Sequence, residues 1–317
     1  MNDCPNGNSS NVFYIVAFSS SSQGQVRLFW GILFIYLMAL FGNLTIIFLV
    51  CLVPKLHTPM YFFLCNLATV DVTSTTYTIP KLLAITLTQD HKISFSGCMT
   101  QIFFFILCAD GEIFILTAMA YDRYVAVCKP LQYHSIMRKN VYIGLAASSW
   151  IVGALNAVAH TILSSILQFC NSHNINNFFC DLNSVISITN TDLTSRKIFM
   201  FTEVFVITIL QFLLTIMSYI FIFSTVLKIR SSAGRMKAFS SCTSHLITVI
   251  LFYGPLTFLY VKPESEDSKE QDMLLSMLYI VVVPMLNPMV YSLRNKDVLG
   301  AVLFLSKQIK AKFWTMD

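Results

Sequence analysis

Long apolar blocks alternate with short polar segments along the 317 residues of this chain. The core of a bilayer is about 30 Å thick, so an α-helix needs about 20 predominantly apolar residues to cross it. Strands of a membrane barrel have only about 10 residues of alternating character, so blocks this long favour helices. The pattern predicts seven membrane-spanning helices, near 27–52, 58–87, 96–128, 141–167, 196–229, 237–261 and 272–293.

The second block is the least clear of the seven, because Asp71 and several Thr and Ser residues between 73 and 78 interrupt it. Composition supports a membrane protein: only 12% of the residues are charged, whereas a soluble domain carries about 25%. No internal repeat or long linker divides the chain. We therefore predict an all-α membrane protein, a seven-transmembrane-helix bundle that forms one domain over 1–317.

Lys and Arg residues set the orientation of the bundle, because they collect on the cytoplasmic side. One side of the predicted bundle carries most of the basic residues, and the third loop on the opposite side is acidic (264–272). The N-terminal tail, 1–26, is therefore outside, and segment 294–317 is inside, where we expect a short amphipathic eighth helix. The net charge of +5 reflects this topology and does not indicate a nucleic-acid partner.

Two covalent features are expected on the outer side. Asn8 begins an Asn-Ser-Ser glycosylation sequon in the polar tail. Cys98 lies at the outer end of the third helix, and Cys170 and Cys180 lie in the second outer loop. A disulfide from the helix to the loop would tie the loop over the bundle. We favour Cys98–Cys180, and Cys98–Cys170 is the alternative.

Ionisable residues inside apolar helices are expensive and usually face the interior of a bundle or a water-filled cavity. Asp110 and Glu112 are two positions apart, so they point to nearly opposite sides of one helix. Asp110 can then face an outer cavity while Glu112 faces Asp71. Two neighbouring carboxylates repel unless they share a proton or a cation, so a structural Na⁺ near Asp71 and Glu112 is a candidate; no other cofactor or metal is expected.

Four motifs stand in order along the chain. They are Leu56–Tyr61 (LHTPMY), Met119–Leu131 (MAYDRYVAVCKPL), Lys237–His245 (KAFSSCTSH) and Pro284–Asn295 (PMLNPMVYSLRN). Together they resemble the vertebrate odorant receptors, a family of rhodopsin-like G-protein-coupled receptors. The resemblance covers almost the whole chain.

The resemblance implies a switch at the inner end of the bundle. Asp122 would hold Arg123 in the resting state, and an outward swing of the sixth helix would free Arg123 for a G-protein helix. Tyr219 and Tyr291 would stabilise the open form. The other residues expected to take part in coupling are Tyr124, His245, Asn287 and Pro288.

The resemblance also implies a ligand cavity in the outer half, between the third, fifth and sixth helices. Residues of shared helical faces that we expect to line it are Phe103, Ile106, Asp110, Glu203, Ile207, Tyr253, Thr257 and Tyr260. Asp110 and Glu203 are unusual, since odorant cavities are mostly apolar. Two carboxylates in one cavity favour an amine ligand; alternatively one is protonated and donates to a carbonyl or alcohol, or Glu203 faces the lipid boundary and snorkels.

The expected function is that of an odorant receptor in the plasma membrane, in the cilia of olfactory sensory neurons, that activates a stimulatory G protein and raises cyclic AMP. A rhodopsin-like receptor for an endogenous amine or metabolite outside the olfactory system is the alternative. Transporters usually show paired repeats, which this chain lacks. Enzyme activity is not expected, since no nucleophile–base pair, metal-ligand cluster or phosphate loop is visible and His160 and His245 stand alone in the sequence.

Overall fold

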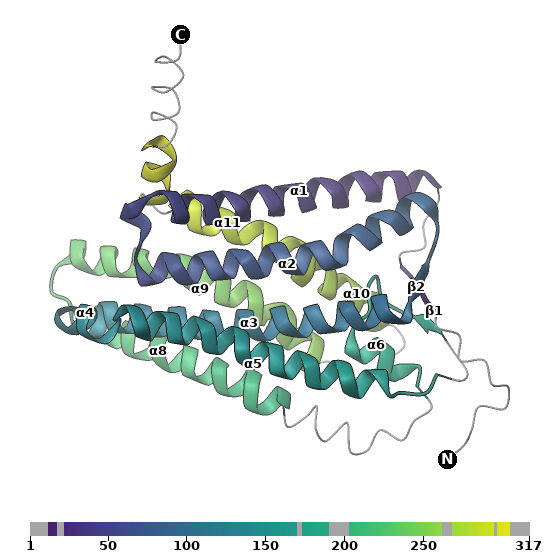
Figure 1. Ribbon diagram of the computed structural model, residues 1–317. Coiled ribbons are helices and arrows are strands. Elements are labelled where there is room, and N and C mark those ends of the chain that lie inside the picture. The colour runs from purple at the N-terminus through teal and green to yellow at the C-terminus, as the bar shows by residue number, and fades with distance from the viewer. Residues whose placement is uncertain are drawn as a thin grey trace, which may run out of the picture.

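The computed structural model of the chain describes residues 12–17, 22–169, 173–189, 203–261, 268–294 and 297–304. Its long helical segments lie side by side and form one elongated bundle (Figure 1). They are α1 (Ser22–Leu52), α2 (Pro59–Thr88), α3 (Phe95–Cys128), α5 (Lys139–Ser165), η3 with α8 (Val204–Ile209, Leu210–Lys228), α9 (Ser232–Val261), and α10, η4 and α11 (Ser268–Met277, Leu278–Val282, Val283–Arg294).

The seven predicted helices correspond to these segments, although the start of the predicted fifth helix, 196–202, lies outside the described residues. Six of the described segments are long and apolar enough to cross a membrane. The one that fails by composition is α2. Its polar residues Asp71, Thr75 and Thr78 are buried inside the bundle, so they lower the average apolar character of α2 without meeting lipid. Residues 297–304 are helical as well, in the position expected for the eighth helix.

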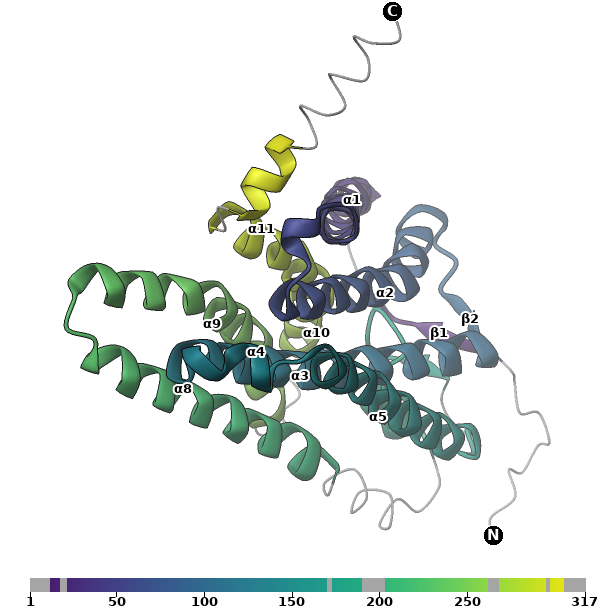
Figure 2. The same cartoon turned by 60° about the vertical axis from the view of Figure 1, so that its left-hand side comes forward.

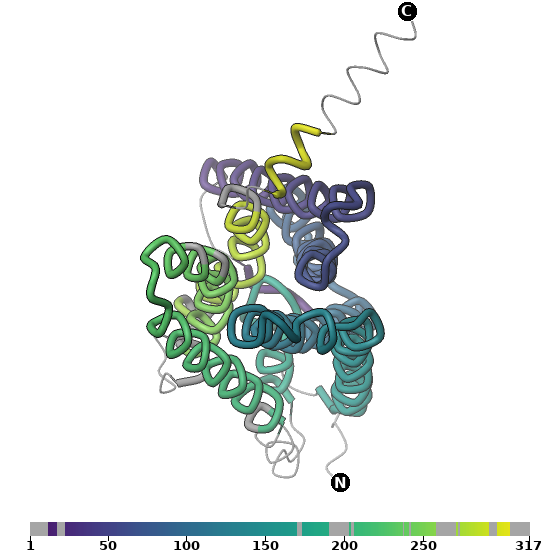
Figure 3. Tube along the Cα trace, turned by 90° about the vertical axis from the view of Figure 1, so that its left-hand side faces the viewer, coloured from purple at the N-terminus to yellow at the C-terminus, as the bar shows by residue number. Residues whose placement is uncertain are grey.

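Helix α3 is the central element of the bundle. It contacts α2, α5, α8 and α9, and the view along the helices from their inner end shows these elements around it (Figure 3). Large apolar side chains on the helices at the periphery of the bundle are exposed, for example Trp30, Phe34 and Phe41 on α1. In water such a surface would be unfavourable, so this outward apolar face fits contact with lipid.

Proline and left-handed backbone mark the helix ends. Pro59 is the first residue of α2, where its missing N–H costs no hydrogen bond. At the other end Gln89 adopts a left-handed conformation (φ 58°) and stops the helix. The hydroxyl of Ser94 accepts a hydrogen bond from the backbone N–H of Gly97 (3.1 Å) and caps α3.

A small sheet closes the outer end of the bundle. Strand β1 (Val12–Ile15) lies between β2 (Lys92–Ser94) and β3 (Asn174–Ile175). It pairs antiparallel with β2 and parallel with β3. The sheet therefore joins the N-terminal tail to the first and second outer loops (Figure 2).

The disulfide Cys98–Cys180 is present, as favoured from the sequence, with a Cα–Cα distance of 5.3 Å. It ties the first turns of α3 to the second outer loop. Some residues named in the sequence analysis lie wholly or partly outside the described parts of the chain, among them Asn8, Cys170, Asn295 and the side chains of Lys237 and Tyr260. The predictions for them stay as they are.

Candidate ligand cavity and coupling site

Helices α3 and α5 approach closely at Gly153. A Cβ atom added there would lie 3.1 Å from the carbonyl oxygen of Leu107 and 3.4 Å from Cβ of Asp110. Asn156 and His160 follow Gly153 at intervals of three and four residues, so all three share the face of α5 that meets α3. The glycine therefore brings the polar side chains of α5 within reach of Asp110.

Four side chains form a hydrogen-bonded network at this place. The amide of Asn156 donates to Oδ2 of Asp110 (2.8 Å) and to Oε1 of Glu203 (2.6 Å). The imidazole of His160 pairs with the other carboxylate oxygen of Glu203. Glu203 directly precedes η3, whose π-helical turns begin at Val204. One asparagine thus bridges two carboxylates that come from different helices.

The network borders a cavity of about 140 Å³ in the outer half of the bundle. Its floor and sides come from α3, α5, η3 and α9, and α10 and η4 close the far side. The lining residues are Phe105, Ile106, Ala109, Asp110, Ile113, His160, Phe179, Asp181, Leu182, Asn183, Glu203, Thr208, Pro255, Leu256, Leu275, Ser276, Tyr279 and Ile280.

The second outer loop forms the roof of the cavity. Phe179 and Cys180 are fully buried, and the backbone N–H of Cys180 donates to Oε1 of Gln101 (2.9 Å). Burial raises the pKa of Asp181, although hydrogen bonds from Ser184 and Asn177 oppose the shift. These bonds cap α6 (Leu182–Ser187) and hold the loop over the cavity.

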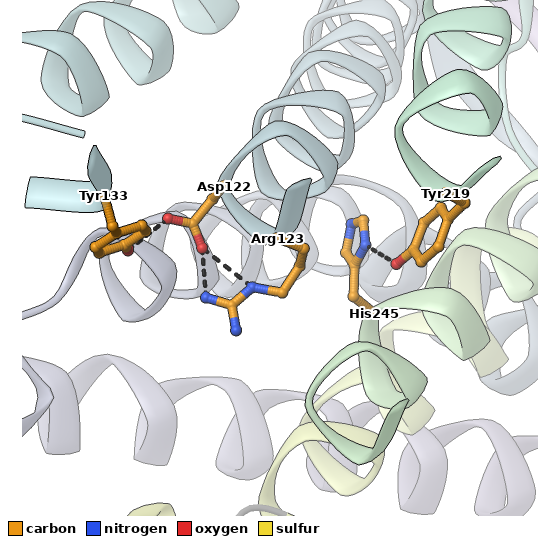
Figure 4. Close-up of polar contacts among 5 residues, drawn as sticks. All are labelled: Asp122, Arg123, Tyr133, Tyr219 and His245. Atoms are coloured by element: carbon orange, nitrogen blue, oxygen red, sulfur yellow. Dashed lines mark hydrogen bonds and ion pairs between the residues drawn. The ribbon is translucent and has the colours of Figure 1, made fainter. Parts of the chain in front are cut away.

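Arg123 forms an ion pair with Asp122 at the inner end of α3 (Figure 4). Nε of Arg123 donates to Oδ2 of Asp122 at 3.1 Å, and the hydroxyl of Tyr133 donates to Oδ1 at 2.7 Å. Burial and the neighbouring Asp122 raise the pKa of Tyr133, which keeps the phenol protonated as a donor. Asp122 is completely buried, so Arg123 supplies the charge that makes this carboxylate tolerable there.

A second polar contact joins α8 and α9 beside this pair (Figure 4). His245 donates from Nε2 to the carbonyl oxygen of Leu116 (3.1 Å), so its Nδ1 accepts from the hydroxyl of Tyr219 (2.6 Å). Tyr291 is also buried. Tyr124 packs its ring against Tyr121 and Phe221.

A buried carboxylate pair lies between these two sites. Asn287 donates to both oxygens of Asp71 (3.3 and 3.0 Å), and Tyr279 donates to one oxygen of Glu112 (3.4 Å). The other oxygen of Glu112 and the amide oxygen of Asn287 are buried without a partner in the described part of the chain. These two oxygens, one from a carboxylate and one from an amide, lie in a region that also holds the Asp71 carboxylate. Oxygen atoms of these kinds suit a hard cation such as Na⁺.

Comparison with known proteins agrees with these features. The sequence profile of the olfactory receptor family matches residues 32–308. The chain belongs to the olfactory receptor family. It is 44% identical to olfactory receptor 1G1 of Gorilla gorilla gorilla over 90% of this chain and 91% of that one. It is also 43% identical to olfactory receptor 5AR1 of Mus musculus, over 91% of this chain and 93% of the relative.

Membership makes the chain an odorant receptor of the G-protein-coupled class, a multi-pass membrane protein and not an enzyme. The histidines that stood alone in the sequence have specific partners in the receptor. His160 pairs with Glu203, and His245 contacts Tyr219. Both sit in polar networks between helices, which a single sequence does not reveal.

The receptor brings together three of the eight residues expected to line the cavity, namely Ile106, Asp110 and Glu203. Glu203 faces this cavity and bonds to α5, so it does not face the lipid boundary. Among the others, the hydroxyl of Thr257 donates to the carbonyl of Tyr253 on its own helix (2.7 Å).

Phe103, Ile207, Tyr253 and Thr257 are not among the lining residues. The residues of α3 that line the cavity are 105, 106, 109, 110 and 113. Phe103 projects to one side of the face that these residues share. Tyr253 packs its ring on Phe212 and Phe252 (centroids 4.8 and 5.0 Å), and its buried hydroxyl has no partner among the described residues.

Sequence reasoning missed Asn156, the role of His160, and the lining residues from the outer loop and α10. The spacing of Gly153, Asn156 and His160 on one face of an otherwise apolar helix was the signal available for the first two. No such local signal exists for Phe179 or Tyr279, because long-range packing brings them to the cavity.

Proposed function

We propose that this odorant receptor binds a small odorant in the outer cavity and activates a stimulatory G protein, which raises cyclic AMP. The observation that carries the proposal is that α3 lines the cavity with its outer half and holds the Asp122–Arg123 pair at its inner end. A ligand that favours one packing of α3 against its neighbours would bias both ends of the same helix. To activate the receptor, the odorant must bind the conformation with α9 moved outward more tightly than the resting conformation.

The inner contacts are suited to a switch. Arg123 is bound to Asp122 in the conformation described here, and His245 on α9 is bound to Tyr219 on α8. An outward movement of α9 would separate the second pair and expose the guanidinium of Arg123. The family resemblance assigns that guanidinium to a G-protein helix.

The experiment that tests this function is a cyclic-AMP reporter screen with a broad odorant panel, repeated with Arg123→Ala. We expect the variant to reach the cell surface and to lose the cyclic-AMP response at least about tenfold. Arg138→Ala is the matched control, since Arg138 is an exposed arginine on the same side. A normal response from Arg123→Ala would overturn the coupling proposal.

We also propose that Na⁺ binds between α2, α3 and α11, held by Asp71, Glu112 and Asn287. The ion would neutralise part of the buried negative charge and stabilise the inactive packing. Replacing external and internal Na⁺ with a large organic cation should therefore raise agonist potency several-fold, and Glu112→Gln should remove this dependence. Equal sodium dependence in wild type and Glu112→Gln would argue against the site.

The site of action that we propose is the ciliary plasma membrane of olfactory sensory neurons. Antibody labelling of olfactory epithelium tests it. Labelling restricted to other tissues would favour the alternative, a receptor for an endogenous amine or metabolite.

A further inference from the structure

The outer cavity carries an excess of acidic side chains. Its acidic lining residues are Asp110, Asp181 and Glu203, one histidine (His160) also lines it, and no Lys or Arg is present among the described residues that line it. The described residues include no group of three or more His, Cys, Asp or Glu arranged to hold a metal ion. The negative charge of the lining favours a cationic ligand.

The three carboxylates are satisfied to different degrees. Glu203 has His160 on one oxygen and Asn156 on the other. Asp181 accepts from Asn177 on one oxygen and from the backbone of Ser184 on the other, in a cap that holds the loop. Both are therefore occupied by the protein itself.

Asp110 differs from the other two. Only its Oδ2 accepts a hydrogen bond, from Asn156, and Oδ1 accepts none from the residues that the structure describes. Asp110 is buried, with 6% of its surface exposed, and it borders the cavity. Oδ1 is not sealed inside the protein, because Asp110 borders the cavity. A carboxylate oxygen that is open to a cavity can accept from a ligand, and a cationic donor forms the strongest hydrogen bond with it.

We propose that Asp110 is the anchor for the ammonium group of a small primary amine, and that amines are the preferred ligand class of this receptor. The inference rests on the proposed function, because it names the ligand of the same cavity. The ammonium donates to Oδ1 of Asp110 while Asn156 continues to hold Oδ2. The His160–Glu203 pair is left intact and does not bind the ligand's charge.

The remaining lining defines the rest of the ligand. Apolar side chains from several elements surround Asp110, among them Phe105, Ile106, Phe179 and Leu256. Cavities that bind drug-sized ligands measure roughly 300–1,000 Å³, whereas this cavity measures about 140 Å³. A compact alkyl or arylalkyl body fits these walls, with its one charged group at Asp110.

The test compares amines with alcohols of the same shape: 2-phenylethylamine with 2-phenylethanol, and hexylamine with hexanol. The first readout is the thermal unfolding midpoint of the purified full-length receptor in lipid nanodiscs, and the second is cyclic AMP in cells. We expect each amine to raise the midpoint more than its alcohol. In cells that give a cyclic-AMP response, the half-maximal concentration of the amine should be at least roughly 30-fold lower than that of its alcohol, as expected for a buried charge pair.

Asp110→Asn should reduce the amine preference to within a few-fold, and Asp110→Glu, which keeps the charge, should retain it. Glu203→Gln makes the same carboxylate-to-amide change in the same cavity, and amines should still be preferred because Asp110 is intact. Asp90→Asn, an exposed carboxylate of the outer loop, is the control for expression and should match wild type in both readouts.

Amines that stabilise the wild-type receptor no better than their alcohols would overturn the proposal, and this comparison needs no variant to fold. Loss of the preference in Glu203→Gln but not in Asp110→Asn would overturn it too, since the cation would then belong to Glu203. Amine stabilisation that requires Asp110 but produces no cyclic AMP would support the ligand class and refute the signalling function.

Discussion

At the scale of single residues, Gly42 on α1 and Pro288 on α11 lie in direct contact. A Cβ atom at Gly42 would be 2.7 Å from Cγ of Pro288, closer than two carbon atoms can approach. Nearby, the amide of Asn43 donates to the carbonyl oxygens of Ala39 (3.0 Å) and Pro284 (2.8 Å). The small residue lets the helices touch, and the amide then satisfies a carbonyl near the proline, where helical hydrogen bonds are lost.

Gly42→Ala should therefore destabilise the receptor, by about 1–3 kcal/mol as expected for overpacking. Since the obstacle is a rigid proline ring, the helices have to separate. The thermal unfolding midpoint of the purified receptor and its surface level should both fall. Gly31→Ala on the same helix is the control, because nothing lies within 4 Å of a Cβ atom there. Equal effects of the two changes would contradict this account.

At the scale of elements, two helices that border the cavity depart from regular α-helical geometry beside it. Residues Val204–Ile209 (η3) and Leu278–Val282 (η4) are π-helical, and each supplies lining residues, Thr208 from one and Tyr279 and Ile280 from the other. Wider turns of this kind rotate the side chains that follow, and they are frequent at functional sites. They help to explain why regular helical spacing misplaced part of the lining.

The disulfide Cys98–Cys180 fixes the outer loop as an element of the cavity. It closes a loop with a sequence separation of 82 residues, for which loop closure contributes about 4.5 kcal/mol in the chain-entropy account. Cys98→Ser or Cys180→Ser should strongly reduce surface expression and response, whereas Cys170→Ser should be milder. Flow cytometry of the three variants checks this, and equal damage from all three would count against it.

At the scale of the whole molecule, the bundle could be predicted from the sequence because lipid imposes one rule on every span. Blocks of apolar residues gave the seven helices, and Asp122–Arg123 and the motifs at the helix ends gave the family. The cavity could be predicted only in part. Ile106 and Asp110 lie about one turn apart on α3, and Glu203 lies at the start of the fifth helical segment, but the partners of Asp110 and Glu203 are on α5, which none of the four motifs covers.

The other residues that line the cavity could not be predicted, because contacts between distant segments bring them there. Phe179 reaches the cavity because the disulfide holds its loop there, and Tyr279 does so through the packing of η4 against α2 and α9. The approach of α5 to α3 at Gly153 does not follow from hydropathy. Such features decide where a cavity opens, so they require the folded arrangement.

Strand β1 has a practical consequence for any count of receptors at the cell surface. Ile15 donates from its backbone N–H to the carbonyl of His91 (2.9 Å), and Tyr14 donates to the carbonyl of His173 (2.8 Å). Residues 12–15 are thus the middle strand of a sheet and not a dispensable leader. An epitope tag or import sequence has to be inserted ahead of residue 12, since one that replaces this strand would leave both outer loops without their shared partner.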